Sequence, residues 1–163
     1  MPTLYLIRHA QAGESGPKYP DDSQRPLVNK GFKQAQTLAD VFSKLEVQFD
    51  FIFSSPYTRA AQTTKPLEVC LRTGKIHYLD NLASSDYDGL LKDISKHLKK
   101  SDKTVALVGH EPYLSEVALY LLSKTNPISI PFKKSAFMAL SGKLKAGQMS
   151  LEIFMPYSVY KHF

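Results

Sequence analysis

Short apolar runs rich in β-branched and aromatic residues alternate along this chain with segments whose apolar residues recur at helical spacing. One such segment begins near Asn29 and places Leu38, Val41, Phe42 and Leu45 on one helical face. The apolar runs have the length of buried strands and lie at residues 4–9, 51–55, 76–79 and 104–110. Strands that alternate with helices predict a mostly parallel sheet covered on both faces. We therefore expect an α/β fold, a doubly wound three-layer α/β/α domain.

The pattern changes after Pro127. Residues 136–140 and 151–155 read as two strands joined through the glycine-containing segment 142–147, which predicts an antiparallel hairpin at one edge of the sheet. Neither an internal repeat nor a linker-like composition divides the chain, so residues 1–163 are expected to form a single domain.

Three prolines and one asparagine indicate where helices begin or break. Asn29 is expected to cap the first helix, and Pro56 and Pro112 are expected to open two others. Pro66 has no backbone N–H to donate, so the helix around it should kink or split.

The charge of the chain favours acidic partners. It carries 21 lysine and arginine residues against 15 aspartate and glutamate residues, a formal net charge of +6. Phosphorylated substrates, nucleic acid and anionic surfaces all fit that excess. The chain has no aromatic-interleaved basic motif of a nucleic-acid-binding module, and its apolar stretches, such as 117–122, are too short to span a bilayer. We therefore expect neither a nucleic-acid nor a membrane partner.

Cys70 is the only cysteine, so it cannot form an internal disulfide, and we expect a buried side chain rather than a nucleophile. The first apolar run carries Arg8 and is followed by polar sequence, unlike a signal peptide. Both features favour a reducing, cytoplasmic location.

Two of the predicted strands end in histidine. Arg8 and His9 terminate the first strand, and His110 terminates the run at 104–110. Catalytic groups gather at the carboxyl ends of strands in open α/β sheets, so these residues are expected to lie together. Arg59 follows shortly after the strand at 51–55 and is expected at the same edge. The sequence therefore predicts one site that holds an anion.

These residue types suit phosphoryl transfer, in which charge is spread over three peripheral oxygens. Arg8 and Arg59 can each donate forked hydrogen bonds to a phosphate. A histidine acts as a nucleophile when one ring nitrogen is unprotonated, and the neighbouring Arg8 favours His9 for that part. His110 would then donate a hydrogen bond to an equatorial oxygen in the transition state.

Three segments together resemble the signature of the histidine phosphatase (phosphoglycerate mutase-like) superfamily. They are Ile7-Arg8-His9-Ala10, Ser54-Ser55-Pro56-Tyr57-Thr58-Arg59-Ala60-Ala61-Gln62-Thr63 and Val108-Gly109-His110-Glu111-Pro112. The small size, the Arg25-Pro26-Leu27 element followed by Gly31 and the lack of a large insertion are most similar to the SixA-type phosphohistidine phosphatases. The resemblance covers residues 3 to about 140.

This resemblance implies a part for each matching residue. His9 would be the nucleophile that becomes phosphorylated, and the phosphate pocket would be completed by Arg8, Arg59 and His110. Arg25 matches a position near the pocket rim, where it would either contact substrate or remain a solvated loop residue. The resemblance implies neither a metal ion nor an organic cofactor.

The proton donor departs from the pattern of the superfamily. Many members have a glutamate at the position that Asn81 matches in this chain, so Asp80, Asp86 or Glu111 would have to take that part. Glu111 lies directly beside His110, although an acidic residue there is also typical of a helix-opening turn.

The missing acid bears on the substrate. An alkyl phosphoester expels a poor leaving group and gains about 10²–10⁴ in rate from a general acid, whereas the weaker N–P bond of phosphohistidine needs less help. We therefore expect a phosphohydrolase acting on phosphohistidine in a phosphotransfer or signalling protein. The alternatives are a phosphatase of small phosphate esters or anhydrides and, in another class, a non-catalytic phosphate-binding module. The sequence leaves open the oligomeric state and whether residues 11–27 form a wall or a flap.

Overall fold

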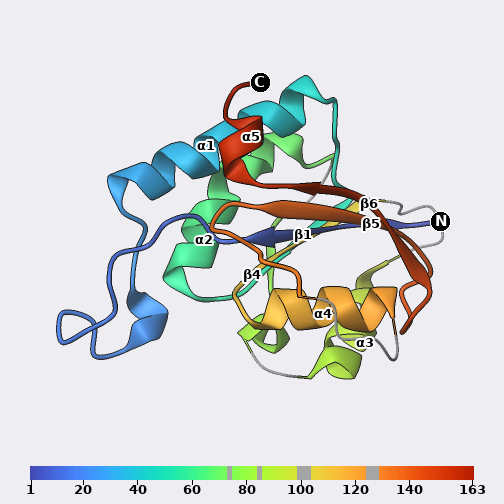
Figure 1. Ribbon diagram of the computed structural model, residues 1–163. Helices are drawn as coiled ribbons and strands as arrows, with labels where there is room; N and C mark the ends of the chain where they lie inside the picture. Colours follow the sequence, from blue (N-terminus) through green and yellow to red (C-terminus); the bar gives the residue numbers. More distant parts are fainter. Residues whose placement is uncertain (73–74, 84–85, 99–103, 124–128) are drawn as a thin grey trace.

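Six strands form one mixed sheet in the order β3-β2-β4-β1-β5-β6 (Figure 1). The computed structural model describes residues 1–72, 75–83, 86–98, 104–123 and 129–163. The first four strands in this order run parallel to one another. The fifth strand is antiparallel to its neighbour in that group, and the sixth is antiparallel to the fifth. The strands are β1 (Thr3–Arg8), β2 (Phe51–Ser54), β3 (His77–Tyr78), β4 (Thr104–Gly109), β5 (Phe137–Gly142) and β6 (Met149–Met155).

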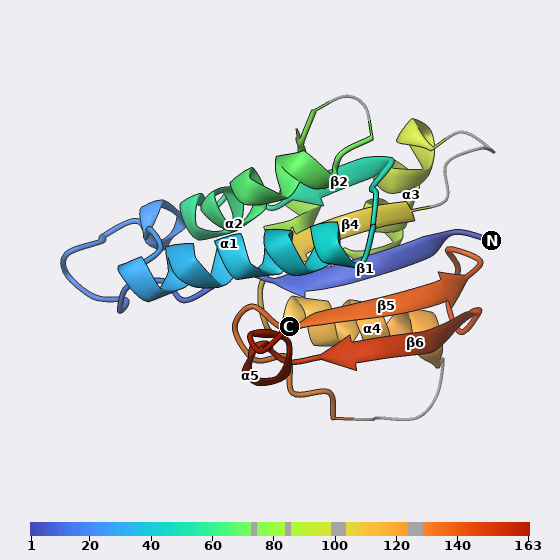
Figure 2. The ribbon, with the colours of Figure 1, turned by 90° about the horizontal axis from the view of Figure 1, so that it is seen from above.

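Helices cover both faces of this sheet. The first face carries α1 (Asn29–Lys44), α2 (Thr58–Thr64) and α5 (Tyr157–Tyr160), and the second carries α3 (Tyr87–His97) and α4 (Tyr113–Leu122) (Figures 1 and 2). The described parts of the connections contain three 3₁₀ helices, η1 (Asp22–Gln24), η2 (Lys65–Cys70) and η3 (Asp80–Ala83). The three-layer α/β/α fold and the antiparallel hairpin at the sheet edge are therefore confirmed.

The central strands are buried on both faces, because helices lie above and below them. In β1, Leu4 and Leu6 pack into the core beneath α3 and α4, whereas Ile7 packs into the core beneath α1 and α2. The alternation of side chains along a strand explains this division. Cys70 belongs to the second core and is buried, as predicted.

The register between β1 and β4 brings the two predicted histidines together. Arg8 pairs with Gly109 in this parallel ladder, so His9 and His110 follow at the same edge of the sheet. In the neighbouring pair, Ser54 of β2 lies opposite Val108. The carboxyl ends of three strands therefore meet where the sequence places its candidate residues.

The predicted helix boundaries need correction at two positions. Asn29 is the first residue of α1 and not its cap, because the N-cap is Val28, whose N–H donates to Gln11 O at 3.0 Å. Pro56 does not open α2, which begins at Thr58. Pro112 does cap α4, and the predicted break at Pro66 is confirmed, since α2 ends at Thr64 and continues as the 3₁₀ helix η2.

Candidate active site

The carboxyl ends of β1, β2 and β4 carry the candidate site. Backbone hydrogen bonds extend the ladder past the strands, since His9 N–H donates to Gly109 O at 3.0 Å and Ser55 N–H donates to Val108 O at 2.9 Å. The rings of His9 and His110 lie with their centroids 5.1 Å apart. The two histidines predicted from separate strands therefore share one site.

His9 is held as a neutral imidazole. Its side chain is buried, and Nδ1 lies 2.7 Å from the carbonyl oxygen of Ala10. Because a carbonyl only accepts, Nδ1 must carry the proton, which leaves a lone pair on Nε2. Burial lowers the pKa of His9 to about 3 despite the opposing bond to Ala10, and the charges of Arg59 and Arg8 lower it further. Nε2 is therefore an available nucleophile at neutral pH.

Thr63 ties the residue after His9 to α2. Its Oγ1 accepts from Ala10 N–H at 2.9 Å and donates to Arg59 O at 2.7 Å. One hydroxyl thus joins two parts of the site, the backbone that orients His9 and the helix that carries Arg59. Thr63 belongs to the second signature segment, but the sequence alone assigned it no part.

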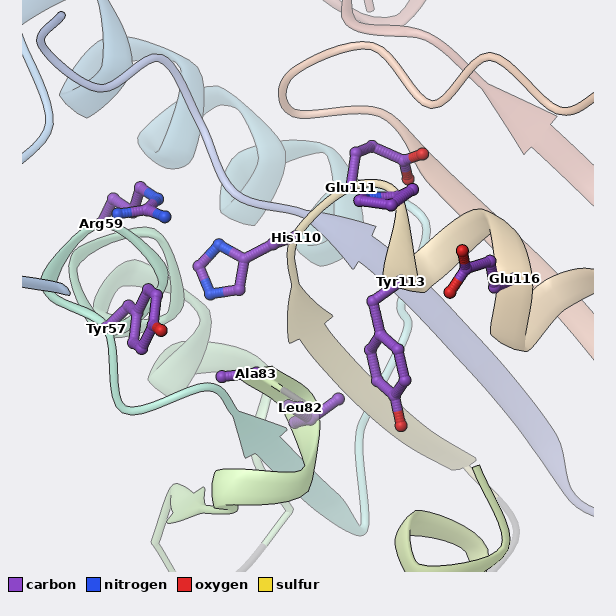
Figure 3. A pocket seen from close by; sticks show the side chains of 9 residues that line it. Tyr57, Arg59, Leu82, Ala83, His110, Glu111, Tyr113 and Glu116 are labelled. Atoms are coloured by element: carbon purple, nitrogen blue, oxygen red, sulfur yellow. The ribbon is translucent and has the colours of Figure 1, made fainter. Parts of the chain in front are cut away.

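His110 is oriented by Ser55. Its Nε2 lies 2.7 Å from Ser55 Oγ, which also accepts from Tyr57 N–H at 3.3 Å. We assign the hydroxyl proton of Ser55 to Nε2, so that Nδ1 of His110 carries the ring proton. Nδ1 is buried and has no hydrogen-bond partner among the described residues, and the ring points toward Arg59 and Tyr57 (Figure 3). Burial lowers the pKa of His110 to about 4, followed by the charge of Arg59.

Both arginines present an unused donor in a buried position. Arg8 Nη1 donates to Phe132 O at 2.6 Å, and Arg59 Nη1 donates to Asp22 O at 2.7 Å. In each side chain Nε is buried without a partner among the described residues. Burial lowers the pKa of both guanidinium groups, yet arginine remains charged in proteins. Buried donors of this kind call for an acceptor, and a phosphate supplies several.

Asp22 is a contact residue that the sequence did not reveal. Its Oδ2 accepts from Arg59 Nη2 at 2.9 Å, and its Oδ1 accepts from Arg25 Nε at 2.8 Å. Arg25 also donates to Gly13 O at 2.6 Å. The hydrogen bond from Arg25, followed by burial in the opposite direction and the charge of Arg59, leaves the pKa of Asp22 below its usual range. Arg25 thus reaches the site through Asp22.

Glu111 is the carboxyl group closest in sequence to the site, and it lines the pocket together with His110. Its carboxylate is directed away from the His110 ring (Figure 3). Ser115 Oγ lies within hydrogen-bond distance of both Glu111 Oε2 and Ile130 O. Burial raises the pKa of Glu111. The hydrogen bond that Ser115 donates to Glu111 and the charge of Arg8 oppose that shift.

Asp86 is placed differently from the sequence-based expectation. It is the N-cap of α3, where Oδ1 accepts from Gly89 N–H at 2.8 Å, and it does not line the pocket. Asn81 Nδ2 donates to Asp93 Oδ2 at 2.6 Å. Neither side chain is brought to His110, so Glu111 is the candidate acid that the structure places at the pocket.

The pocket beside His110 combines charge with apolar surface (Figure 3). Leu82, Ala83 and Tyr113 provide its apolar walls, and Arg59, Glu111 and Glu116 provide its charges. Among the described residues no three His, Cys, Asp or Glu side chains group as a metal site. Nor does any helix in the described part of the chain have the length and apolar character needed to cross a membrane.

Comparisons with known proteins place the chain in a family and a fold. A sequence model of the histidine phosphatase superfamily (branch 1) matches residues 4–111. An uncharacterized protein of Picosynechococcus sp. is 28% identical over 138 residues, which cover 84% of this chain and 83% of that protein. Two further curated relatives are longer, and the matched region makes up only 17% and 30% of their length.

Solved structures show the same fold. A protein histidine phosphatase SixA complexed with tungstate has a TM-score of 0.80 at 21% identity, with 96% of this chain and 97% of that chain covered. A phosphoserine phosphatase of Entamoeba histolytica in complex with 3-phosphoglyceric acid has a TM-score of 0.68 at 18% identity, with 95% of this chain and 97% of that chain covered.

Proposed function

The chain belongs to the histidine phosphatase superfamily and is a phosphatase, and we propose that it removes phosphate from phosphohistidine in a protein through a phosphohistidine intermediate on His9. The observation that carries this proposal is the neutral His9 with its lone pair on Nε2, set beside unpartnered donors of Arg8, Arg59 and His110. A nucleophile and a set of anion-binding donors thus occupy one buried site.

The first half-reaction transfers the phosphoryl group to the enzyme. Arg8 and Arg59 bind the peripheral oxygens, and the Nδ1–H of His110 donates to the same group as charge develops on it. Nε2 of His9 attacks phosphorus, the N–P bond of the substrate breaks, and the freed imidazole takes up a proton from solvent water.

The second half-reaction returns the enzyme to its starting state. A water oxygen attacks phosphorus, the bond to Nε2 breaks, and the water protons leave with the inorganic phosphate or pass to solvent. Nδ1 of His9 keeps its proton throughout, because Ala10 O can only accept. Phosphoprotein and water therefore give protein and inorganic phosphate, with no change of oxidation state.

The preference for phosphohistidine rests on the leaving group. Asp86 caps a helix, Asn81 contacts Asp93, and the carboxylate of Glu111 is turned away from the His110 ring. An imidazole leaving group tolerates such a site better than an alkoxide does. The fold shared with a protein histidine phosphatase supports the same choice.

The position of Glu111 supports a second candidate function, that of a phosphatase of small phosphomonoesters. Its raised pKa and its place in the pocket would let it protonate an alkoxide after a change of rotamer. The same fold occurs in a phosphoserine phosphatase.

The test compares a phosphohistidine-bearing phosphotransfer protein with an alkyl phosphomonoester, using the wild type, His9→Ala and Glu111→Gln. We expect rapid loss of phosphate from the phosphoprotein, abolished by His9→Ala and little changed by Glu111→Gln. Efficient ester hydrolysis that Glu111→Gln lowers by about 10²–10⁴ would instead establish the second candidate. Binding of the phosphoprotein by wild type and His9→Ala alike, with turnover of neither substrate, would identify a non-catalytic binding module.

A further inference from the structure

A second cleft lies beside Arg8 and shares no lining residue with the pocket of His110 and Glu111. It lies between the segment that precedes β5 and the short helix α5, and its volume is about 350 Å³. Arg8, Lys133, Lys134, Tyr157 and Ser158 line it. Arg8 thus belongs both to the phosphate site and to this cleft, so a molecule seated there lies beside the reacting group.

The two sides of the site differ in charge. Glu111 and Glu116 line the pocket beside Arg59, whereas the described residues that line the cleft beside Arg8 include no carboxylate. Neither Lys133 nor Lys134 forms an ion pair with a described residue. Burial, followed by the charges of Arg8 and Arg25, lowers the pKa of Lys134, as expected for a cation among cations. The cleft therefore presents positive charge without an internal partner.

The turn that carries the two lysines is held in place by buried contacts. Phe132 O accepts from Arg8 at 2.6 Å, and Ser135 N–H donates to His9 O at 3.2 Å. On the far side Tyr160, which is buried in α5, donates to Ser135 O at 2.5 Å. Lys133 and Lys134 are exposed between these anchors. The turn is thus joined at one end to the side chain of Arg8 and at the other end to the backbone of His9.

We propose that Lys133 and Lys134 dock an acidic surface of the phosphoprotein substrate next to its phosphorylated histidine. This proposal rests on the proposed function and adds the direction from which the substrate approaches. Exposed ammonium groups with no internal partner attract and orient a carboxylate-rich surface. Tyr157 and Ser158 continue the same surface with an aromatic ring and a hydroxyl, and tyrosine is enriched in protein interfaces.

The experiment measures kcat/KM on two substrates, the phosphohistidine-bearing phosphotransfer protein and the small probe phosphoimidazole. The variant Lys133→Gln/Lys134→Gln neutralises the turn, and Lys133→Arg/Lys134→Arg keeps its charge. Lys143→Gln/Lys145→Gln serves as the matched control. These lysines lie in the β5–β6 turn, beyond the pairing of Ser141 with Thr3, at the ends of the strands opposite those that carry the site. Both neutral variants lose the same charge.

For the phosphoprotein, the neutral Lys133/Lys134 variant should lower kcat/KM by about tenfold at low ionic strength, and the loss should shrink as salt is added. The arginine variant should restore most of the rate, and the control should change it by less than about twofold. Phosphoimidazole, which has no acidic surface, should lose less than about threefold in the same variant.

Different failures separate the two proposals. A wild type that leaves the phosphoprotein untouched refutes the proposed function and the docking surface with it. A wild type that turns it over while the neutral variant matches the control refutes the docking surface alone. Equal losses on both substrates would also overturn it, since the lysines would then act on the phosphoryl group itself.

Discussion

At the scale of single residues, the positions of two protons set what the site can do. Ala10 O holds the proton of His9 on Nδ1, and Ser55 holds that of His110 on the nitrogen that faces Arg59. One ring therefore offers a lone pair and the other offers a donor, although both are neutral histidines. A phosphoryl group between them meets a nucleophile on one side and a hydrogen bond on the other.

Ser55→Ala tests the assignment at His110. Without the hydroxyl, Nε2 loses its donor and the ring can take the other tautomer, so kcat should fall by about 10–100-fold, as for other residues that orient a functional histidine. Ser54→Ala is the matched control, because Ser54 loses a buried hydroxyl that donates to Ser55 O and does not contact His110. Steady-state kinetics on both variants decide the matter, and equal losses would contradict the assignment.

Asp22→Asn tests the carboxylate that bridges the two arginines. Removing its charge frees Nη2 of Arg59, so inorganic phosphate should inhibit at lower concentration. The guanidinium also loses its orientation, so kcat should fall by about tenfold. Asp21→Asn is the control, since Asp21 accepts from Ser23 in the same loop and has no described contact with an arginine. A lower kcat with weaker phosphate binding would contradict this account.

The convergence of Arg8, His9, Arg59 and His110 could be predicted from sequence because each stands close to the end of an apolar strand, where local pattern and fold rule agree. Asp22 could not, since its contact with Arg59 depends on the path of a long polar loop that no local periodicity describes. The tautomer of His110 could not be predicted either, because it depends on how close Ser55, which follows another strand, lies to the ring.

At the scale of elements, the start of α1 sets the position of the segment after β1. Val28 N–H donates to Gln11 O, and Gln11 N–H donates to Gln34 Oε1 at 2.8 Å. Gly31 lies against the same backbone, and a Cβ there would come within 2.0 Å of Gln11 O. The residues that follow His9 are thus fixed by close contact with a helix.

Gly31→Ala should therefore destabilise the protein. Replacing glycine by alanine within a helix ordinarily stabilises it by about 1 kcal/mol. Here the overlap with Gln11 forces a backbone shift that costs about 1–3 kcal/mol, and activity should fall with it. Urea unfolding of Gly31→Ala beside Lys33→Ala, an exposed position of α1, measures the effect. A gain in stability for Gly31→Ala would show that the contact is not tight.

The helix boundaries show where sequence patterns stop being informative. Asn29 is a good cap by composition, yet Val28 takes the place because its N–H meets Gln11 O, which lies far from it in the sequence. The strands were easier to predict, since burial on both faces leaves a continuous apolar run. The order of the strands in the sheet, with β1 between β4 and β5, could not be predicted from any single apolar run of the sequence.

At the scale of the whole molecule, two neutral histidines, the buried His9 and the half-buried His110, couple the fold to pH. The pKa of His9 is about 3 and that of His110 about 4 in the folded protein, against about 6.5 in an unfolded chain. Below about pH 6.5 the unfolded chain binds protons that the folded site refuses, so the free energy of unfolding should fall as pH drops from about 6.5 to about 4. Above that range these histidines contribute no pH dependence. Glu111, with its raised pKa, opposes the trend in part.

Urea unfolding at pH 7 and pH 5 checks this coupling. The wild type should lose more stability between the two pH values than His9→Asn/His110→Asn, which has no imidazole to protonate at either position. Equal losses would mean that the two rings have the same pKa values in the folded protein as in the unfolded chain.

The most direct test of the account is to trap the phosphorylated enzyme. The protein is mixed with the phosphohistidine-bearing protein, quenched in alkali during turnover, digested and mapped by mass spectrometry. We predict one phosphoryl group on the peptide that contains His9, which appears before inorganic phosphate, decays as substrate is used up, and is absent from His9→Ala. Phosphate release without a modified peptide, or a phosphoryl group on His110 instead, would contradict the assignment of His9 as the nucleophile.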